Sequence, residues 1–264
     1  MNIGENIKKM SFKINQVNKL PNLKDAILIE GLPGIGNVGK IALDFMVENL
    51  KAKKIFEVKS KKFPNSVFIN EKNLAELPKI EIYHKKVNNK DLLFLSGDIQ
   101  PLEDESCYDF CEKILELFKS LKGKEIITLG GIGLSKPPEE PKVFCTANTQ
   151  EIMEKYKQDN NINSNLFGLV GPIMGVSGLL IGLGKEHDIP SISILAETYG
   201  HPSYLGVKGA REILKRLNKS LGMDLNLKDL DKEIKEMDKE IKNIVALQKT
   251  SKLPSKPTKL SYIG

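Results

Sequence analysis

The sequence predicts an α/β protein built on a mostly parallel sheet with helices on both faces. Short apolar runs of four or five residues alternate with segments of helical periodicity, as in parallel strands joined by crossover helices. Glycine clusters directly follow two of the runs, where open α/β sheets have their strand ends. We expect residues 1–222 to form one α/β domain, residues 223–248 an amphipathic heptad helix, and residues 249–264 a flexible tail.

The composition is that of a globular protein. The 264 residues include 40 Lys and Arg and 34 Asp and Glu, which gives a net charge of +6. With 28% charged and 40% hydrophobic residues, a fully disordered chain and a collagen-like fibre are excluded. The charge is too small to predict a nucleic-acid-binding face. The absence of Trp, with only 6% aromatic residues, also argues against a platform for stacking bases.

In the first half of the chain, each apolar run of strand length is bounded by polar or glycine-containing segments. The expected strands are 12–17 at a sheet edge, then 26–30, 55–58, 67–69, 80–83 and 92–95. Helical spacing of apolar residues predicts a helix over 41–50 and a clearly amphipathic one over 104–121, which Gly123 ends.

The second half continues the alternation. The expected strands are 126–129, 143–146, 166–170 and 191–196, and the expected helices are 149–157, 176–187 and 204–221. The uncharged run 160–184 has an apolar part about long enough to span a bilayer. Its six glycines and Pro172 favour a strand, a turn and the start of a buried helix, so we expect no membrane span.

Two glycine loops are candidates for ligand binding. Gly34, Gly36 and Gly39 satisfy the dinucleotide fingerprint between a strand and a helix, where backbone amides can approach a phosphate. Glu57, at the end of the next strand, has the spacing of a ribose ligand. The alternatives are a tight strand-to-helix turn and plain close packing. The two candidate loops contain Gly31, Gly34, Gly36, Gly39, Gly130, Gly131 and Gly133.

Catalytic and metal-binding patterns are weak. Ser177 lies in a sequence close to a nucleophile elbow, but Leu179 replaces the required glycine. No two histidines have metal-ligand spacing, and two of the three cysteines lie on the apolar face of the 104–121 helix. His187 is expected to interact with a helix end, and His201 lies in a loop. We expect no catalytic residue, metal or cofactor, and a reducing cytoplasmic environment.

A heptad pattern marks the region after residue 222. The residues between its apolar positions are almost all charged, with acid-first pairs four residues apart. Such a helix packs on its own domain or pairs with a copy of itself, and we expect a homo-oligomer. The apolar positions are Leu227, Leu230, Ile234, Met237, Ile241 and Ile244.

The last sixteen residues have the composition of a disordered segment. They contain two prolines and several lysines, and end in Leu260-Ser-Tyr262-Ile263-Gly264. Apolar and aromatic residues beside a free carboxylate suit a pocket with a lysine or backbone donors. The tail is therefore either a tethered ligand or a disordered end with a few chance apolar residues.

Four motifs in order resemble those of the proteasome assembly chaperone family in its archaeal form. They are Gly31-Leu-Pro-Gly34-Ile-Gly36-Asn-Val-Gly39, Gly130-Gly131-Ile-Gly133, Gly171-Pro172 with Gly175-Val-Ser-Gly178, and Leu195-Ala-Glu197-Thr198. The resemblance covers about residues 20–220. It implies a phosphorylase/hydrolase-like α/β fold without an established enzyme activity. It also implies homo-oligomers and binding to the α ring of the proteasome core particle as assembly chaperone or ATP-independent activator.

The resemblance also assigns a role to the tail. In some archaeal members a hydrophobic residue, a Tyr and a final residue insert between neighbouring α subunits, where the carboxylate meets a lysine and the gate opens. This implies proteasome contacts by Leu260, Tyr262, Ile263 and Gly264. The sequence departs from the pattern, because Tyr262 stands in the hydrophobic position and Ile263, which has no hydroxyl, in the Tyr position. The competing hypothesis is a nucleotide- or small-molecule-binding enzyme that uses the Gly34–Gly39 loop.

Overall fold

The structure is a computed structural model that describes residues 12–160, 162–168, 171–232 and 234–236. It has two compact units, Met1–Asn226 and Leu227–Gly264. The first holds the named helices and strands. None of its helices is both long and apolar enough to cross a bilayer, in a search confined to the described residues.

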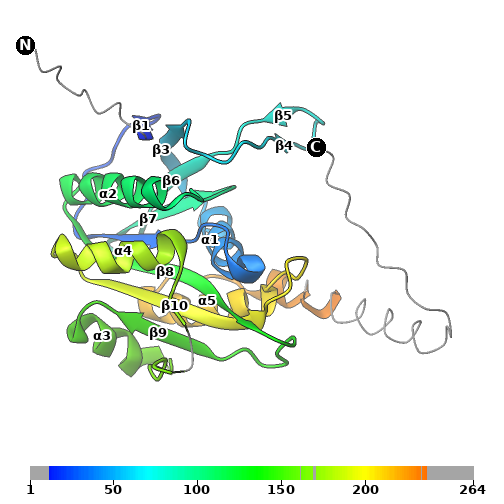
Figure 1. The fold of residues 1–264 in the computed structure, drawn as a ribbon. Helices are drawn as coiled ribbons and strands as arrows, with labels where there is room; N and C mark the ends of the chain where they lie inside the picture. Colours follow the sequence, from blue (N-terminus) through cyan, green and yellow to red (C-terminus); the bar gives the residue numbers. More distant parts are fainter. Residues whose placement is uncertain (1–11, 161, 169–170, 233, 237–264) are drawn as a thin grey trace, which may run out of the picture. The chain divides into compact units, whose positions relative to one another are not determined.

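An eight-stranded mixed sheet forms the centre of the first unit (Figure 1). Its order is β1-β3-β6-β7-β2-β8-β10-β9. The four strands β7, β2, β8 and β10 are parallel, whereas the strands at both flanks pair antiparallel. The bounds are β1 Phe12–Gln16, β2 Ala26–Glu30, β3 Lys53–Ser60, β6 Ile80–Val87, β7 Lys90–Gly97, β8 Gly123–Leu134, β9 Val143–Ala147 and β10 Ser191–Tyr199.

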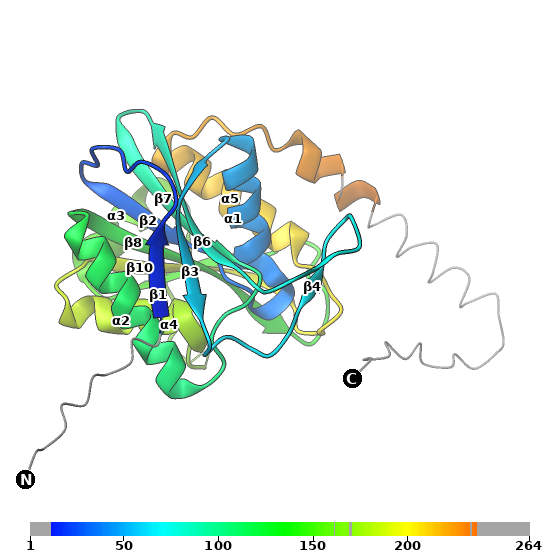
Figure 2. The same ribbon diagram turned by 90° about the horizontal axis from the view of Figure 1, so that it is seen from above.

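Helices cover both faces of this sheet, as Figure 2 shows. Helices α2 and α4 pack together on one face, and α1 and α5 on the other, with α3 beside α5. All five residues of β2 are buried, because a central parallel strand is covered on both sides. The helices are α1 Val38–Asn49, α2 Asp104–Ser120, α3 Gln150–Asn160, α4 Gly175–Glu186 and α5 Val207–Leu221, and a 3-10 turn, η1, spans Ile35–Asn37.

The predicted fold class is confirmed, since helices cover both faces of a sheet whose four central strands are parallel. The edge position of the first strand is also confirmed, because β1 ends the sheet order. The strand expected over 166–170 is wrong where the structure describes it: residue 166 is irregular, and 167–168 form a turn with Gly168 at φ +77°. Three residues before it, Asn163 forms an isolated parallel bridge with Phe144.

A hairpin leaves the large sheet between β3 and β6. Its strands β4, Phe68–Ile69, and β5, Ala75–Glu76, form a separate two-stranded sheet. The apolar run at 67–69 predicts β4 correctly, but its exposed side chains are not those of a core strand.

Candidate functional site

A pocket of about 830 Å³ lies at the carboxyl ends of the parallel strands. Gly130, Gly131 and Gly133 of β8 line it together with Gly34 from the loop after β2 and Gly39 from the first turn of α1. The start of α4 and the segment before α2 complete its walls. The two predicted glycine loops thus meet at one pocket, at the strand ends where open α/β sheets bind ligands.

The glycines of these loops permit close packing between backbones. A Cβ on Gly39 would stand closer than 3.0 Å to the carbonyl oxygen of Leu129, and one on Gly131 equally close to that of Ile35. Gly31 faces the carbonyl oxygen of Gly39 in the same way. The missing side chains therefore let the loop after β2 and helix α1 lie directly on β8.

Gly36 and Gly34 differ in their surroundings. Gly36 has φ +61°, and the side chain of Thr198 occupies the space that an added Cβ on Gly36 would need. Gly34 alone in the 31–39 loop has no heavy atom within 4 Å of an added Cβ. Packing accounts for Gly31, Gly39 and Gly131, and a left-handed conformation for Gly36, but neither accounts for Gly34, and ligand binding at these loops stays a prediction.

Glu57 does not lie beside the loop. In the sheet, β6 and β7 separate β3 from β2, so Glu57 is about 14 Å away across the strands. The expected ribose-ligand role for Glu57 is wrong, because the next strand in sequence is not the next strand in space. Its carboxylate lies 3.5 Å from Lys59 instead.

A buried carboxylate lies behind the pocket. Glu30, the last residue of β2, has no exposed surface. It accepts hydrogen bonds from the backbone N–H of Leu32 at 2.8 Å and from the Ser177 hydroxyl at 2.9 Å. Burial raises its pKa to about 7, although both hydrogen bonds act in the opposite direction. Since Ser177 lines the pocket, Glu30 joins the strand end to the first turn of α4.

Sequence reasoning missed Glu30. The available signal was a single carboxylate at the end of the apolar run Ala26–Glu30. Its partner Ser177 lies 147 residues further on, so no local pattern connects the two.

With this geometry in view, comparison with known proteins decides the family. The family model described as PAC2 matches residues 28–245. The chain belongs to the PAC2 family. The predicted resemblance to proteasome assembly chaperones is confirmed, because the similar solved structures include archaeal proteins described in those terms.

Two of these structures come from Pyrococcus furiosus. PbaB, described as an archaeal proteasome activator, is 31% identical with a TM-score of 0.82, over 89% of this chain and 99% of that one. PbaA, described as an archaeal homolog of proteasome-assembly chaperone, is 25% identical with a TM-score of 0.73, over 90% and 93%. The uncharacterized protein MJ1210 of Methanocaldococcus jannaschii is 29% identical over 94% of this chain and 96% of its own.

The histidines and cysteines of this PAC2 chain have structural partners. His187 is the C-cap residue of α4 and lies 2.8 Å from Glu112 of α2, in agreement with the expected helix-end role. His201 stacks on Tyr199. Cys107 and Cys111 are buried in α2. The part of the chain that the structure describes contains no cluster of three or more His, Cys, Asp or Glu suited to a metal ion.

The heptad segment of this PAC2 chain is described only in part. Residues 228–232 and 234–236 are helical. Leu230 is buried and Leu227 and Ile234 are half-buried. The positions Met237, Ile241 and Ile244, and all four proteasome-contact residues predicted in the tail, lie outside the described residues. The oligomer and tail roles therefore stay predictions.

Proposed function

We propose that this protein is a non-enzymatic, cytoplasmic binding protein that acts on the proteasome core particle as an assembly chaperone or ATP-independent activator. The observation that supports this most is the similarity to PbaB, with 31% identity and a TM-score of 0.82 over 89% of the chain. PbaA, with its description as a homolog of an assembly chaperone, supports the same target. Assays of binding to the core particle and of peptide hydrolysis distinguish an assembly chaperone from an activator.

The proposed contact is made by the C-terminal tail with the α ring. Leu260, Tyr262 and Ile263 supply apolar surface, and Gly264 supplies the carboxylate. An extended peptide end of this kind suits a pocket with a basic side chain. A homo-oligomer assembled through the 227–248 helix would present several tails at once, which raises the avidity well above that of one tail.

The competing enzyme hypothesis has less support from the geometry. The pocket is of the size that binds small molecules. However, Gly36, Gly39 and Gly131 face protein atoms where a phosphate cradle needs open backbone. The Rossmann arrangement also needs an acidic residue on the neighbouring strand, whereas two strands, β6 and β7, lie between β2 and the strand of Glu57.

Removal of the last five residues should abolish the effect on the core particle. We would compare the full chain with a chain that ends at Lys259, in a pull-down with the cognate core particle and in fluorogenic-peptide hydrolysis. For the shortened chain we expect apparent affinity to fall by about tenfold or more and stimulation of hydrolysis to disappear. Tyr262→Ala should reproduce most of this loss, and Ser261→Ala is the matched control.

Other outcomes separate the alternatives. If both chains bind equally and neither stimulates hydrolysis, the globular unit makes the contact and the tail mechanism is wrong. If neither binds, action on the core particle is contradicted, and nucleotides should be titrated against the pocket.

A further inference from the structure

Another pocket, of about 460 Å³, lies at the opposite end of the sheet, where the parallel strands begin. Lys90 is the first residue of β7, Asp25 directly precedes β2, and Lys124 is the second residue of β8. Helix α3 and the last turn of α5 complete its walls. This lysine pocket is therefore separate from the glycine pocket, which lies at the carboxyl ends of the same strands.

Positive charge dominates the lining of the lysine pocket. Five lysines line it together with two carboxylates, those of Asp25 and Glu125. Glu125 is 4% exposed, pairs with Lys155 and accepts a hydrogen bond from the Tyr156 hydroxyl at 2.7 Å. One lining carboxylate, that of Asp25, is thus left for the four remaining ammonium groups. The five lysines are Lys24, Lys86, Lys90, Lys124 and Lys155.

Three of these ammonium groups are unpaired. The side chains of Lys24, Lys86 and Lys124 are exposed and make neither an ion pair nor a hydrogen bond with any residue that the structure describes. Lys90 donates to the carbonyl oxygen of Ser220 near the end of α5, at 3.3 Å. Charges of one sign that line a concave surface repel one another and concentrate ions of the opposite sign there. The arrangement therefore favours a bound anion.

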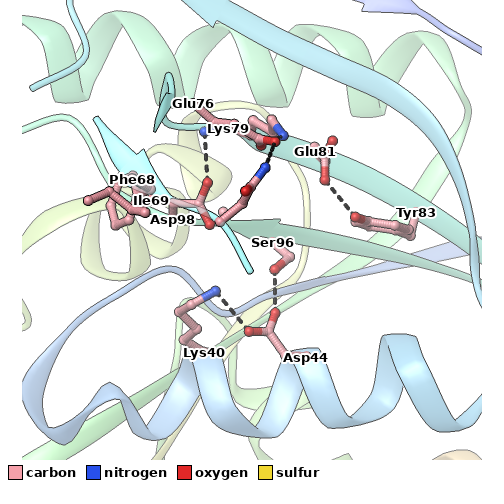
Figure 3. Close-up of a pocket in the computed structure, with 12 residues that line it drawn as sticks. Lys40, Asp44, Phe68, Ile69, Glu76, Lys79, Glu81, Tyr83, Ser96 and Asp98 are labelled. Atoms are coloured by element: carbon pink, nitrogen blue, oxygen red, sulfur yellow. Dashed lines mark hydrogen bonds and ion pairs between the residues drawn. The ribbon is translucent and has the colours of Figure 1, made fainter. Parts of the chain in front are cut away.

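The lysines of a different polar pocket have partners on the chain. Figure 3 shows this pocket, of about 370 Å³, which residues of the β4–β5 hairpin, β6, β7 and α1 line. Four carboxylates and two lysines line it. Lys40 lies 2.8 Å from Asp44, and Lys79 pairs with Glu76. Most lysines of the lysine pocket lack such partners among the described residues, so the chain itself does not neutralise them.

We propose that the lysine pocket binds a compact polyanion with two or three linked phosphate groups. Its volume is that of a small-molecule site. Ammonium groups form strong, charge-assisted hydrogen bonds with phosphate oxygens. Linked phosphates concentrate more negative charge in a given volume than carboxylates do, which suits five lysines around one small pocket.

The lining favours the phosphate chain over a nucleotide base. Tyr156 is the aromatic residue among the described lining residues, but it is buried and its hydroxyl is bonded to Glu125. It therefore offers no face on which a base could stack. A free di- or triphosphate and the phosphate chain of a nucleotide share the chemistry that this pocket recognises.

Contacts around the lysine pocket hold its walls in place. The Asn88 side chain donates to the carbonyl oxygen of Gly222 at 2.6 Å and so connects the β6–β7 turn to the end of α5. The backbone N–H of Lys24 donates to the Asp91 carboxylate at 3.0 Å and connects the segment before β2 to β7. A site that is already formed loses less conformational entropy when a ligand binds.

Asp25 provides a sensitive test because it opposes an anionic ligand. Its exposed carboxylate lines the pocket and repels negative charge. Its φ of +49° is a left-handed conformation, which asparagine also adopts. Asp25→Asn therefore removes one negative charge and keeps the backbone conformation, and it should tighten binding.

Isothermal titration calorimetry of the full chain with tripolyphosphate, at low ionic strength, measures these effects. Lys24→Gln/Lys124→Gln should raise the dissociation constant about tenfold or more, and Asp25→Asn should lower it about threefold. Lys61→Gln/Lys62→Gln is the matched control, because it changes the net charge equally at two exposed positions after β3. It should leave the dissociation constant unchanged. Thermal unfolding verifies that all three variants are folded.

ATP without magnesium is the second probe and distinguishes the two sources of the phosphate chain. Equal affinities for ATP and tripolyphosphate would indicate that the phosphate chain alone is recognised, whereas tighter binding of ATP would indicate a nucleotide. In both cases ATP should lose affinity in the Lys24→Gln/Lys124→Gln variant. ATP that keeps its full affinity in this variant would overturn the proposal, because its phosphates would then lie elsewhere.

Three further results would overturn the proposal. The first is the absence of saturable binding of tripolyphosphate to the wild type. The second is an equal loss of affinity in the Lys61→Gln/Lys62→Gln control, which would indicate a response to net charge alone. The third is weaker binding in Asp25→Asn. The titrations contain no core particle, so this proposal and the proposed action on the proteasome can each fail alone.

Discussion

Gly39→Ala should destabilise the α/β unit strongly. The added Cβ would stand closer than 3.0 Å to the carbonyl carbon and oxygen of Leu129, which belongs to the central strand β8. Gly39 is in the first turn of α1 and is buried, so neither backbone can yield without displacing the other. Overpacking of a fixed core costs about 1–3 kcal/mol, and contact with backbone places this variant at the upper end or beyond. Urea unfolding followed by circular dichroism measures the loss.

Gly34→Ala is the matched control for this experiment. Gly34 has φ −154°, an extended conformation that alanine adopts readily, and no heavy atom lies within 4 Å of the added Cβ. We expect its stability to change by less than about 0.5 kcal/mol. Equal losses in the two variants would contradict the packing role of Gly39. A fall in nucleotide affinity for Gly34→Ala at unchanged stability would instead support the ligand loop.

The parallel core could be predicted because its strands are buried on both faces. Burial on two sides demands a continuous apolar run, and β2 and the middle of β7 and β8 show such runs directly in the sequence. The bounds of the amphipathic helix α2 were predicted almost to the residue, since one of its faces packs on the sheet and must be apolar while the other is exposed to solvent. These signals are local, which is why one sequence suffices for them.

The order of the strands could not be predicted in the same way. The placement of Glu57 assumed that β3 follows β2 in the sheet, whereas β7 takes that position. Strand order depends on contacts between segments far apart in the chain. An apolar run in the sequence does not indicate which other strand it pairs with. The strand expected over 166–170 was also wrong in the part that the structure describes, because residues 167–168 form a turn in which Gly168 has φ +77°.

The candidate site was predicted in outline but not in its chemistry. Glycine clusters after strands correctly located the pocket, since the ends of parallel strands meet at one edge. The acidic run Glu103–Glu105 was visible in the sequence, but a helix N-terminus explained it equally well. Only the structure places one of these carboxylates, that of Asp104, in the lining of the pocket.

Glu30→Gln should change the pH dependence of stability. The pKa of Glu30 is about 7 in the folded chain and near its usual 4.5 in the unfolded chain. Below pH 4.5 the carboxyl group of Glu30 is protonated in both states, so its burial adds no charge-related loss of unfolding free energy. As the pH rises toward 7, the unfolded chain releases its proton while the folded chain keeps it, so unfolding becomes more favourable. Above pH 7 the full cost of a buried carboxylate is present, about 3 kcal/mol.

The glutamine variant removes this titration and keeps the shape of the side chain. Its carbonyl can accept from the Leu32 N–H, and its amide can donate to the Ser177 hydroxyl, so the two contacts survive. Relative to the wild type, the variant should gain about 3 kcal/mol of unfolding free energy between pH 4.5 and pH 8, most of it between pH 4.5 and pH 7. Urea unfolding at several pH values measures this difference, with the exposed Glu103→Gln as control. Parallel pH profiles of the wild type and the Glu30 variant would show that the pKa of Glu30 is not raised by folding, so that Glu30 is ionised in the folded chain at neutral pH. The carboxylate behind the pocket would then be a permanent negative charge, which would disfavour phosphate-bearing ligands at this site and further weaken the nucleotide hypothesis.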